Sequence, residues 1–199
     1  MIKKPNQITD KQLLALIAEG NKQAFSQLMK RYLPAVINFS MRYFSQRSDA
    51  EDIAQETFTR LWCKAPVWQD KGISVKAWLF RVAYNQCIDQ LRKQKPQYLA
   101  GYNENIIDQT AFIESMMDIN AQLAIQRFAL EKLPERQRTA IALCAIRGFS
   151  NSEAAIVMGT SVEALESLMA RGRRALKKMY SLAMEQEKIE RGIVNGICR

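Results

Sequence analysis

Hydrophobic side chains recur every three or four residues along most of the chain, and this spacing predicts helices. Phe25, Leu28, Met29 and Tyr32, for example, have the i, i+3, i+4, i+7 spacing of a helix that buries one stripe. The strict alternation of apolar and polar residues that is typical of strands is absent, and only 8 residues are glycine. The pattern therefore predicts an all-α protein.

Capping residues and prolines predict where the helices of the first half begin and end. In a capping box each side chain satisfies a free backbone amide of the other residue, and two such boxes are Thr9 with Gln12 and Ser48 with Glu51. Pro34 is expected to open a new helix or to kink the chain into it. The first three predicted helices run from Thr9 to Gly20, through 25–32 and from Pro34 onward. A fourth runs from Ser48 to Trp62 and is broken at Pro66. A fifth is capped by Ser74, runs from Val75 to about Lys95 and is stopped by Pro96.

The periodicity weakens over residues 97–120, and this stretch contains no Lys or Arg. Its four acidic residues are Glu104, Asp108, Glu114 and Asp118. The fold class predicted is two small helical domains joined by a flexible acidic linker. The expected boundaries are a first domain at 1–96, the linker at 97–120, a second domain at 121–180 and a C-terminal tail of unknown role at 181–199.

The second domain has the pattern of a helix-turn-helix. A helix that begins near Pro134 is expected to end at Gly148, a left-handed C-cap with Phe149 as its hydrophobic contact. A short helix, a glycine turn at Gly159 and a longer helix that reaches at least Met179 follow. The capping boxes expected for these two helices are Ser150 with Glu153 and Thr160 with Glu163.

At 100° per residue the last long helix has two opposite faces. Its apolar stripe is Leu165, Leu168, Met169, Gly172, Leu176 and Met179. Its polar stripe is Glu163, Glu166, Ser167, Ala170, Arg174 and Lys177, with Arg171 and Lys178 at the edge. A recognition helix needs early residues that reach base edges and later cations that neutralise phosphates, so this face predicts DNA contact. A face that is merely solvated is the alternative.

A narrow polar and aromatic stripe runs along the helix predicted from Val75 to Lys95, between two apolar flanks. The stripe consists of Trp78, Arg81, Asn85, Asp89 and Arg92. Rings that stack on bases, cations that hold phosphates and an amide that reads a base edge are what single-stranded nucleic acid requires. The alternative places Trp78 in the core, with Arg81 lying over it. For Trp78 alone this core placement is favoured, whereas for Asn85 with Arg81 and Arg92 both interpretations stay open.

An acidic face is predicted on the helix from Ser48 to Trp62. Its members are Asp49, Asp52 and Glu56, extended by Gln55 and Thr59. Because carboxylates repel DNA, this face favours a protein partner with a basic patch. One alternative is a solvated face whose acids lie favourably near a helix N-terminus. Another is that the carboxylates bind a metal ion, although no complementary carboxylate pair is evident elsewhere in the sequence.

Charge and composition narrow the function further. The 199 residues include 29 Lys and Arg against 20 Asp and Glu, a net charge of +9, which favours nucleic acid first and an anionic membrane surface second. The chain contains no histidine, which excludes Ser-His-Asp and Cys-His nucleophiles, HExxH zinc sites and facial-triad iron sites. We therefore expect no catalytic residue, no metal and no cofactor.

Cysteine usage and hydropathy predict a cytoplasmic protein. The four cysteines contain no CxxC pair, and no secretory segment is evident. They are Cys63, Cys87, Cys144 and Cys198. No apolar run approaches the roughly 20 residues that a membrane span needs.

Three segments together resemble a known family. They are AEDIAQETFTRLW (Ala50–Trp62), AWLFRVAYNQCIDQLRK (Ala77–Lys93) and LPERQRTAIALCAIRGFSNSEAAIVMGTSVEALESLMARGRRALKK (Leu133–Lys178). Their order and spacing are similar to those of the extracytoplasmic-function sigma factors, over roughly Thr9 to Met179. The resemblance implies a promoter-specificity subunit of bacterial RNA polymerase, with two helical domains and a flexible linker.

The resemblance also implies a role for each segment. The polymerase-binding residues, which dock on the clamp coiled coil of the largest subunit, would be Asp52, Gln55 and Glu56. The residues that capture and hold the minus-ten element would be Trp68, Trp78, Arg81, Asn85, Asp89 and Arg92. The residues that read the minus-thirty-five element would be Glu163, Glu166, Ser167, Arg171, Arg174, Lys177 and Lys178. The linker would thread toward the RNA exit path, and an anti-sigma protein is an expected partner.

The chain departs from the family pattern at two positions. Many members carry Arg or Lys where Glu166 stands, so Glu166 would accept a hydrogen bond from a cytosine amino group instead of reading guanine. The residues just before Trp78 lack the usual aromatic side chains, which leaves Trp68 for base capture. The alternative functions are a stand-alone helix-turn-helix regulator that binds duplex DNA and a metal-dependent nuclease.

Overall fold

The protein is described by a computed structural model that covers residues 8–70, 72–98, 130 and 132–197. Every regular element in these ranges is a helix, which confirms the all-α prediction. The elements divide into two compact units. Apart from residues 97–98, the predicted linker at 97–120 lies outside the described residues, as does the start of the second block near residue 121.

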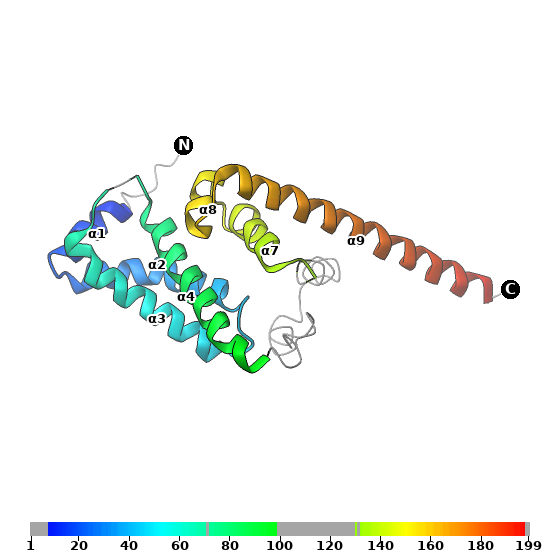
Figure 1. Ribbon diagram of the computed structural model, residues 1–199, viewed down its shortest axis with the longest axis horizontal. Coiled ribbons are helices and arrows are strands. Elements are labelled where there is room, and N and C mark those ends of the chain that lie inside the picture. The colour runs from blue at the N-terminus through cyan, green and yellow to red at the C-terminus, as the bar shows by residue number, and fades with distance from the viewer. Residues whose placement is uncertain (1–7, 71, 99–129, 131, 198–199) are drawn as a thin grey trace, which may run out of the picture. The chain divides into compact units, whose positions relative to one another are not determined.

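The first unit is a helical bundle (Figure 1). The elements are α1 (Asp10–Ala18), α2 (Lys22–Ser40), α3 (Arg47–Lys64), the short 3₁₀ turn η1 (Ala65–Val67) and α4 (Val75–Tyr98). Helix α2 packs against the other three, and α3 packs against α4. Phe39, Phe58 and Phe80, one from each of α2, α3 and α4, are fully buried, and the Phe39 and Phe80 ring centroids lie 5.2 Å apart. Burying each ring contributes about 2–3 kcal/mol, so these helices hold the unit together.

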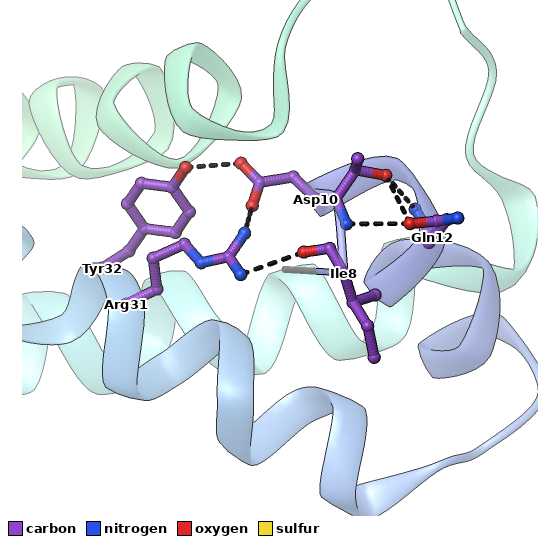
Figure 2. Close-up of polar contacts among 6 residues, drawn as sticks. Ile8, Asp10, Gln12, Arg31 and Tyr32 are labelled. Carbon is purple, nitrogen blue, oxygen red and sulfur yellow. Dashed lines mark hydrogen bonds and ion pairs between the residues drawn. The ribbon is translucent and has the colours of Figure 1, made fainter. Parts of the chain in front are cut away.

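A polar cluster ties the start of α1 to the middle of α2 (Figure 2). The Asp10 carboxylate accepts hydrogen bonds from the Tyr32 hydroxyl and the Arg31 guanidinium, and Arg31 Nη2 also donates to the Ile8 carbonyl at 3.0 Å. Burial, and then the adjacent Asp10 carboxylate, raises the pKa of Tyr32 above its ordinary value. The hydroxyl therefore keeps its proton at neutral pH and remains a donor to Asp10.

Only one of the two capping boxes predicted for the first unit is present at a helix start. The Thr9–Gln12 capping box is confirmed, with Thr9 N donating to Gln12 Oε1 at 2.9 Å. The Ser48–Glu51 box is wrong, because α3 begins at Arg47 and the Glu51 carboxylate instead accepts from Arg47 Nε at 2.7 Å. A capping bond and an i, i+4 ion pair are each worth at most about 1 kcal/mol, so either can win.

Prolines end helices less often here than the pattern predicts. Pro66 does end α3, within the turn η1, and Ser74 Oγ caps α4 by accepting from Ala77 N at 3.1 Å. Helix α2, however, is continuous through Pro34, and α4 continues past Pro96 to Tyr98. A proline inside a helix costs about 3 kcal/mol, and at Pro34 the packing of α2 against three helices offsets that cost.

The C-terminal helices have the helix-turn-helix order. They are α7 (Glu135–Ile141), which leads into a π-helical turn η2 (Ala142–Ile146), then α8 (Asn151–Met158) and α9 (Val162–Ile197). The left-handed cap at Gly148 is confirmed by its φ of 66°, and Phe149 beside it is buried. The last helix, predicted to reach at least Met179, continues as one helix to Ile197, through most of the segment 181–199.

One of the two capping boxes in this region is confirmed. Glu153 N donates to Ser150 Oγ at 3.2 Å, and Ser150 N donates to Glu153 Oε2 at 3.1 Å. The Thr160–Glu163 box is wrong by one residue, because Ser161 Oγ caps α9 by accepting from Ala164 N at 3.2 Å. The turn after Gly159 thus places the serine, not the threonine, at the N-cap.

Helix α7 packs closely against α9 at Gly172, which is buried. A β-carbon at this position would lie 2.7 Å from Ile141 Cδ1 and 3.5 Å from Gln137 Cβ. Glycine at position 172 therefore lets the two helix backbones approach where a larger residue would separate them.

Gly172→Leu is expected to destabilise the helix-turn-helix. Overpacking costs about 1–3 kcal/mol, which exceeds the roughly 1 kcal/mol gained by replacing glycine within a helix. Thermal unfolding followed by circular dichroism measures the effect. Ala170→Leu, at an exposed position of the same helix, is the matched control, and equal unfolding curves for the two variants would contradict the close packing.

Among the described helices, none has the length and hydrophobicity that crossing a membrane requires.

Candidate nucleic-acid interface

The acidic face of α3 is exposed as predicted. Asp52, Gln55 and Glu56 all point to solvent, while the opposite face of α3 is buried. Glu56 accepts from Arg60 Nε at 2.7 Å within the same helix. Asp52, in contrast, has no ion pair with any described residue. The face thus presents a carboxylate that forms no ion pair with the cations in the described ranges.

The described residues contain no group of three His, Cys, Asp or Glu side chains placed to hold a metal ion. The interpretation of the α3 carboxylates as metal ligands therefore finds no ligand set in this part of the chain.

The predicted stripe on α4 is a continuous exposed face. Four of its members are exposed, and they are Arg81, Asn85, Asp89 and Arg92. Arg92 Nη1 lies 3.7 Å from Asp89 Oδ1, while the side-chain amide of Asn85 has no partner among the described residues. The two flanks of the stripe are packed into the bundle, with Leu79, Phe80, Ala83 and Cys87 fully buried. The packed flanks thus fix α4 in the bundle and leave this face exposed.

The structure brings Trp68 and Trp78 together. Their ring centroids lie 5.5 Å apart with the planes at 66°, an edge-to-face arrangement, and both side chains are partly exposed. Trp78 is therefore half-buried beside Trp68 and is not enclosed in the core. The pair forms an aromatic surface at the N-terminal end of the α4 stripe.

The loop that holds Trp68 is tied to α1 by two residues that the sequence pattern did not identify. Asp70 Oδ1 accepts from Gly72 N at 3.1 Å, and Asp70 Oδ2 accepts from Lys11 Nζ at 2.7 Å. The Lys11 ammonium, and then the Gly72 amide, lower the pKa of Asp70. An Asp two residues before a Gly is a turn signal that was present in the sequence, whereas its partner 59 residues away left no signal.

On α9 the two predicted faces are both confirmed by burial. Leu165, Met169 and Gly172 are buried and the remaining apolar positions are half-buried. All the predicted DNA-facing residues are exposed, and they are Glu163, Glu166, Ser167, Arg171, Arg174, Lys177 and Lys178. Hydrogen bonds to its own backbone and to Ser161 lower the pKa of Glu163, which keeps this carboxylate ionised. The exposed face is thus acidic and polar over its first turns and cationic beyond.

One residue outside α9, Asn151, contacts this face and was missed by the sequence pattern, and Cys144 in η2 contacts Asn151 in turn. Asn151 Nδ2, at the start of α8, donates to Glu166 Oε1 at 3.1 Å, and Asn151 Oδ1 accepts from Cys144 Sγ at 3.7 Å. Helical periodicity relates residues within one helix, so it carries no signal for a contact between α8 and α9.

Comparison with known proteins identifies the family. The Sigma-70 region 2 family matches residues 28–97, and the Sigma-70 region 4 family matches residues 127–176. The RNA polymerase sigma factor CnrH of Cupriavidus metallidurans is 30% identical over 186 residues, which cover 89% of this chain and 97% of CnrH. The ECF RNA polymerase sigma factor SigW of Bacillus subtilis is 28% identical over 179 residues, which cover 84% of this chain and 95% of SigW. The chain belongs to the extracytoplasmic-function sigma factors.

Solved structures agree with this assignment. The sigma factor resembles CnrH, solved in complex with the cytosolic domain of CnrY, with a TM-score of 0.65 and 31% identity over 87% of this chain and 97% of that one. It also resembles RpoE of Bartonella quintana, solved with the anti-sigma factor NepR, with a TM-score of 0.64 and 28% identity over 79% and 96% of the two chains.

Membership of this family establishes the general function of the protein. This protein is a sigma subunit that directs promoter recognition, and the stand-alone regulator is not favoured, because region 2 accompanies the helix-turn-helix on one chain. Sigma factors are transcription initiation factors and not enzymes. The region 2 match includes the exposed faces of α3 and α4, and the region 4 match includes α7, α8 and the first part of α9.

Proposed function

We propose that this sigma factor divides promoter recognition among three exposed faces. The face of α3 binds the polymerase core, the stripe on α4 with Trp68 binds the minus-ten element, and the face of α9 binds the minus-thirty-five element. The domains that carry these roles are 1–96 and 121–180, joined by the linker at 97–120. The observation that carries the proposal is that region 2 contains both an acidic face and an exposed aromatic and cationic face, neither of which a duplex-binding regulator needs.

The polymerase contact is assigned to Asp52, Gln55 and Glu56. These side chains are exposed on one face of α3, and Asp52 is not neutralised by any described cation. A carboxylate-rich surface on a protein with a net charge of +9 selects against DNA and favours a basic protein surface, which the clamp coiled coil of the polymerase would supply.

The minus-ten contact is assigned to Trp68 and to the α4 stripe, which comprises Trp78, Arg81, Asn85, Asp89 and Arg92. Aromatic stacking contributes about 1–3 kcal/mol per base, and cations along the same face neutralise phosphates. The unpartnered Asn85 amide offers both a donor and an acceptor to the edge of an unstacked base.

Strand separation in this proposal depends on the polymerase core. Melting about ten base pairs costs on the order of 14 kcal/mol in stacking. The sequence contains no glycine-rich phosphate-binding loop that would couple the cost to nucleotide hydrolysis. Binding energy from flipped bases, stacking and phosphate contacts must therefore sustain the open strands, and free sigma factor alone would bind duplex promoter weakly.

The minus-thirty-five contact is assigned to the exposed face of α9. Glu163, Glu166 and Ser167 lie on the first turns, where a recognition helix reaches base edges. The later cations, which neutralise phosphates, are Arg171, Arg174, Lys177 and Lys178.

An anti-sigma protein is proposed as a further partner, since RpoE was solved with the anti-sigma factor NepR and CnrH was solved with the cytosolic domain of a second protein, CnrY. The sigma factor would act in the cytoplasm, where the polymerase core is.

Transcription in vitro tests the proposed function. Purified bacterial core polymerase, mixed with this sigma factor and a promoter library, is expected to initiate at a small set of templates that share an upstream and a downstream element. Sigma factor without core is expected to bind the same templates weakly in a gel-shift assay. Tight binding and melting of duplex promoter without core would contradict the proposal.

A further inference from the structure

Asn151 occupies a bridging position in the helix-turn-helix. It is the first residue of α8, and its side chain links the π-helical turn η2 to the exposed face of α9. The amide nitrogen donates to Glu166 Oε1 at 3.1 Å, and the amide oxygen accepts from Cys144 Sγ at 3.7 Å. A carboxylate can only accept and a protonated thiol donates, so both partners require the same orientation of the amide.

The Cys144 thiol, which donates to Asn151, remains a hydrogen-bond donor at neutral pH. Burial raises the pKa of the Cys144 thiol, against a smaller opposing effect of the Arg173 charge. The thiol therefore keeps its proton and can hold the Asn151 oxygen.

Glu166 has Asn151 as its partner, although the cations of the same helix face follow it in the next turns. Arg171 Nη2 donates to Ser167 Oγ at 2.8 Å, and Arg174 Nε donates to the Ala170 carbonyl at 3.4 Å, so neither arginine neutralises Glu166. In the described part of the chain Glu166 forms no ion pair. Its carboxylate is thus held by a neutral donor through Oε1, and no described residue bonds to its second oxygen, Oε2.

A carboxylate on a DNA-binding surface is repelled by phosphates and needs a hydrogen-bond donor on a base. In the major groove the cytosine N4 amino group is the donor that glutamate accepts from. A glutamate whose orientation is set before binding loses less side-chain freedom when it reaches that base. Asn151 supplies this orientation from outside the recognition helix.

We propose that Asn151 is a positioning residue for Glu166, holding one carboxylate oxygen so that the other accepts from cytosine in the upstream promoter element. The inference rests on the proposed function, since it requires that α9 reads the minus-thirty-five element. It adds a specificity-determining residue that lies on α8, outside the face of α9.

The test measures base preference in the assembled polymerase. Core enzyme with each sigma variant transcribes a library in which the upstream element is randomised and the downstream element is constant. Glu166→Ala is expected to lower the preference for cytosine at one base pair about tenfold. Asn151→Ala is expected to lower it about three- to fivefold at the same base pair, and the double variant to match Glu166→Ala alone.

Two further variants sharpen the test. Asn151→Asp has the same shape but lacks the donor and places a second carboxylate beside Glu166, so the preference is expected to fall at least as far as in Asn151→Ala. Ser152→Ala, at the adjacent exposed position of α8, is the matched control and is expected to keep the wild-type preference.

Three outcomes overturn the inference. Asn151→Ala with wild-type preference shows that Glu166 needs no positioning. A lower melting temperature with weaker transcription from all sequences equally shows a structural role instead. Wild-type preference in Glu166→Ala shows that Glu166 reads no base. A wild-type enzyme with no upstream preference at all would contradict the proposed function itself.

Discussion

Asp52→Arg is expected to abolish assembly of the sigma factor with RNA polymerase core. The substitution replaces an exposed carboxylate, which no described cation neutralises, by a cation facing a basic partner surface. Like charges brought together at an interface cost several kcal/mol, so core affinity should fall at least about a hundredfold. Fluorescence anisotropy of labelled sigma factor titrated with core measures the affinity directly.

The stability of the Asp52→Arg protein should not change, because exposed substitutions away from special features alter the free energy of unfolding by less than about 0.5 kcal/mol. Glu19→Arg is the matched control, since it makes the same change of charge at an exposed position at the end of α1. Equal core affinity of the Asp52 and Glu19 variants would contradict the docking role of α3.

Asn85→Ala is expected to impair open-complex formation while core binding stays intact. The Asn85 amide lies exposed in the middle of the α4 stripe without a partner among the described residues, so the substitution breaks no internal hydrogen bond. A specific contact to a base edge is worth about 1–3 kcal/mol, which predicts a loss of roughly tenfold or more in the rate of promoter opening. Permanganate footprinting of unpaired thymines over time measures that rate.

Asn38→Ala provides the control for this experiment, because Asn38 is an exposed asparagine of α2 outside the stripe. A template that is already unpaired over the minus-ten element bypasses melting and should recover most of the lost rate. If Asn85→Ala opens the duplex promoter as fast as Asn38→Ala does, Asn85 does not contact the minus-ten element.

The faces of individual helices could be predicted from the sequence, since residues three and four apart in a helix must share a side. The exposed stripe on α4 and the two faces of α9 therefore agree with their spacing. Spacing also placed Trp78 on the stripe, but it could not predict the contact of Trp78 with Trp68, in a loop ten residues earlier. No periodicity relates a loop to a helix.

Helix boundaries were predicted less well, because several local interactions of similar strength compete at each end. Ser161 rather than Thr160 caps α9, and Glu51 pairs with Arg47 rather than capping α3. The competing interactions at each helix end differ in free energy by at most about 1 kcal/mol, so a small change in the backbone path can reverse which of them forms. Pro34 shows the larger effect, since packing against three helices retains it inside α2.

The sequence by itself determined the helical class, the identity of each exposed face and, through three spaced segments, the family. Only the tertiary structure decided which residues from different elements meet, such as Asn151 with Glu166, Lys11 with Asp70 and Trp68 with Trp78. The physical reason is that helical periodicity follows from the backbone geometry of one segment. A contact between segments depends instead on the packing of the unit that contains both.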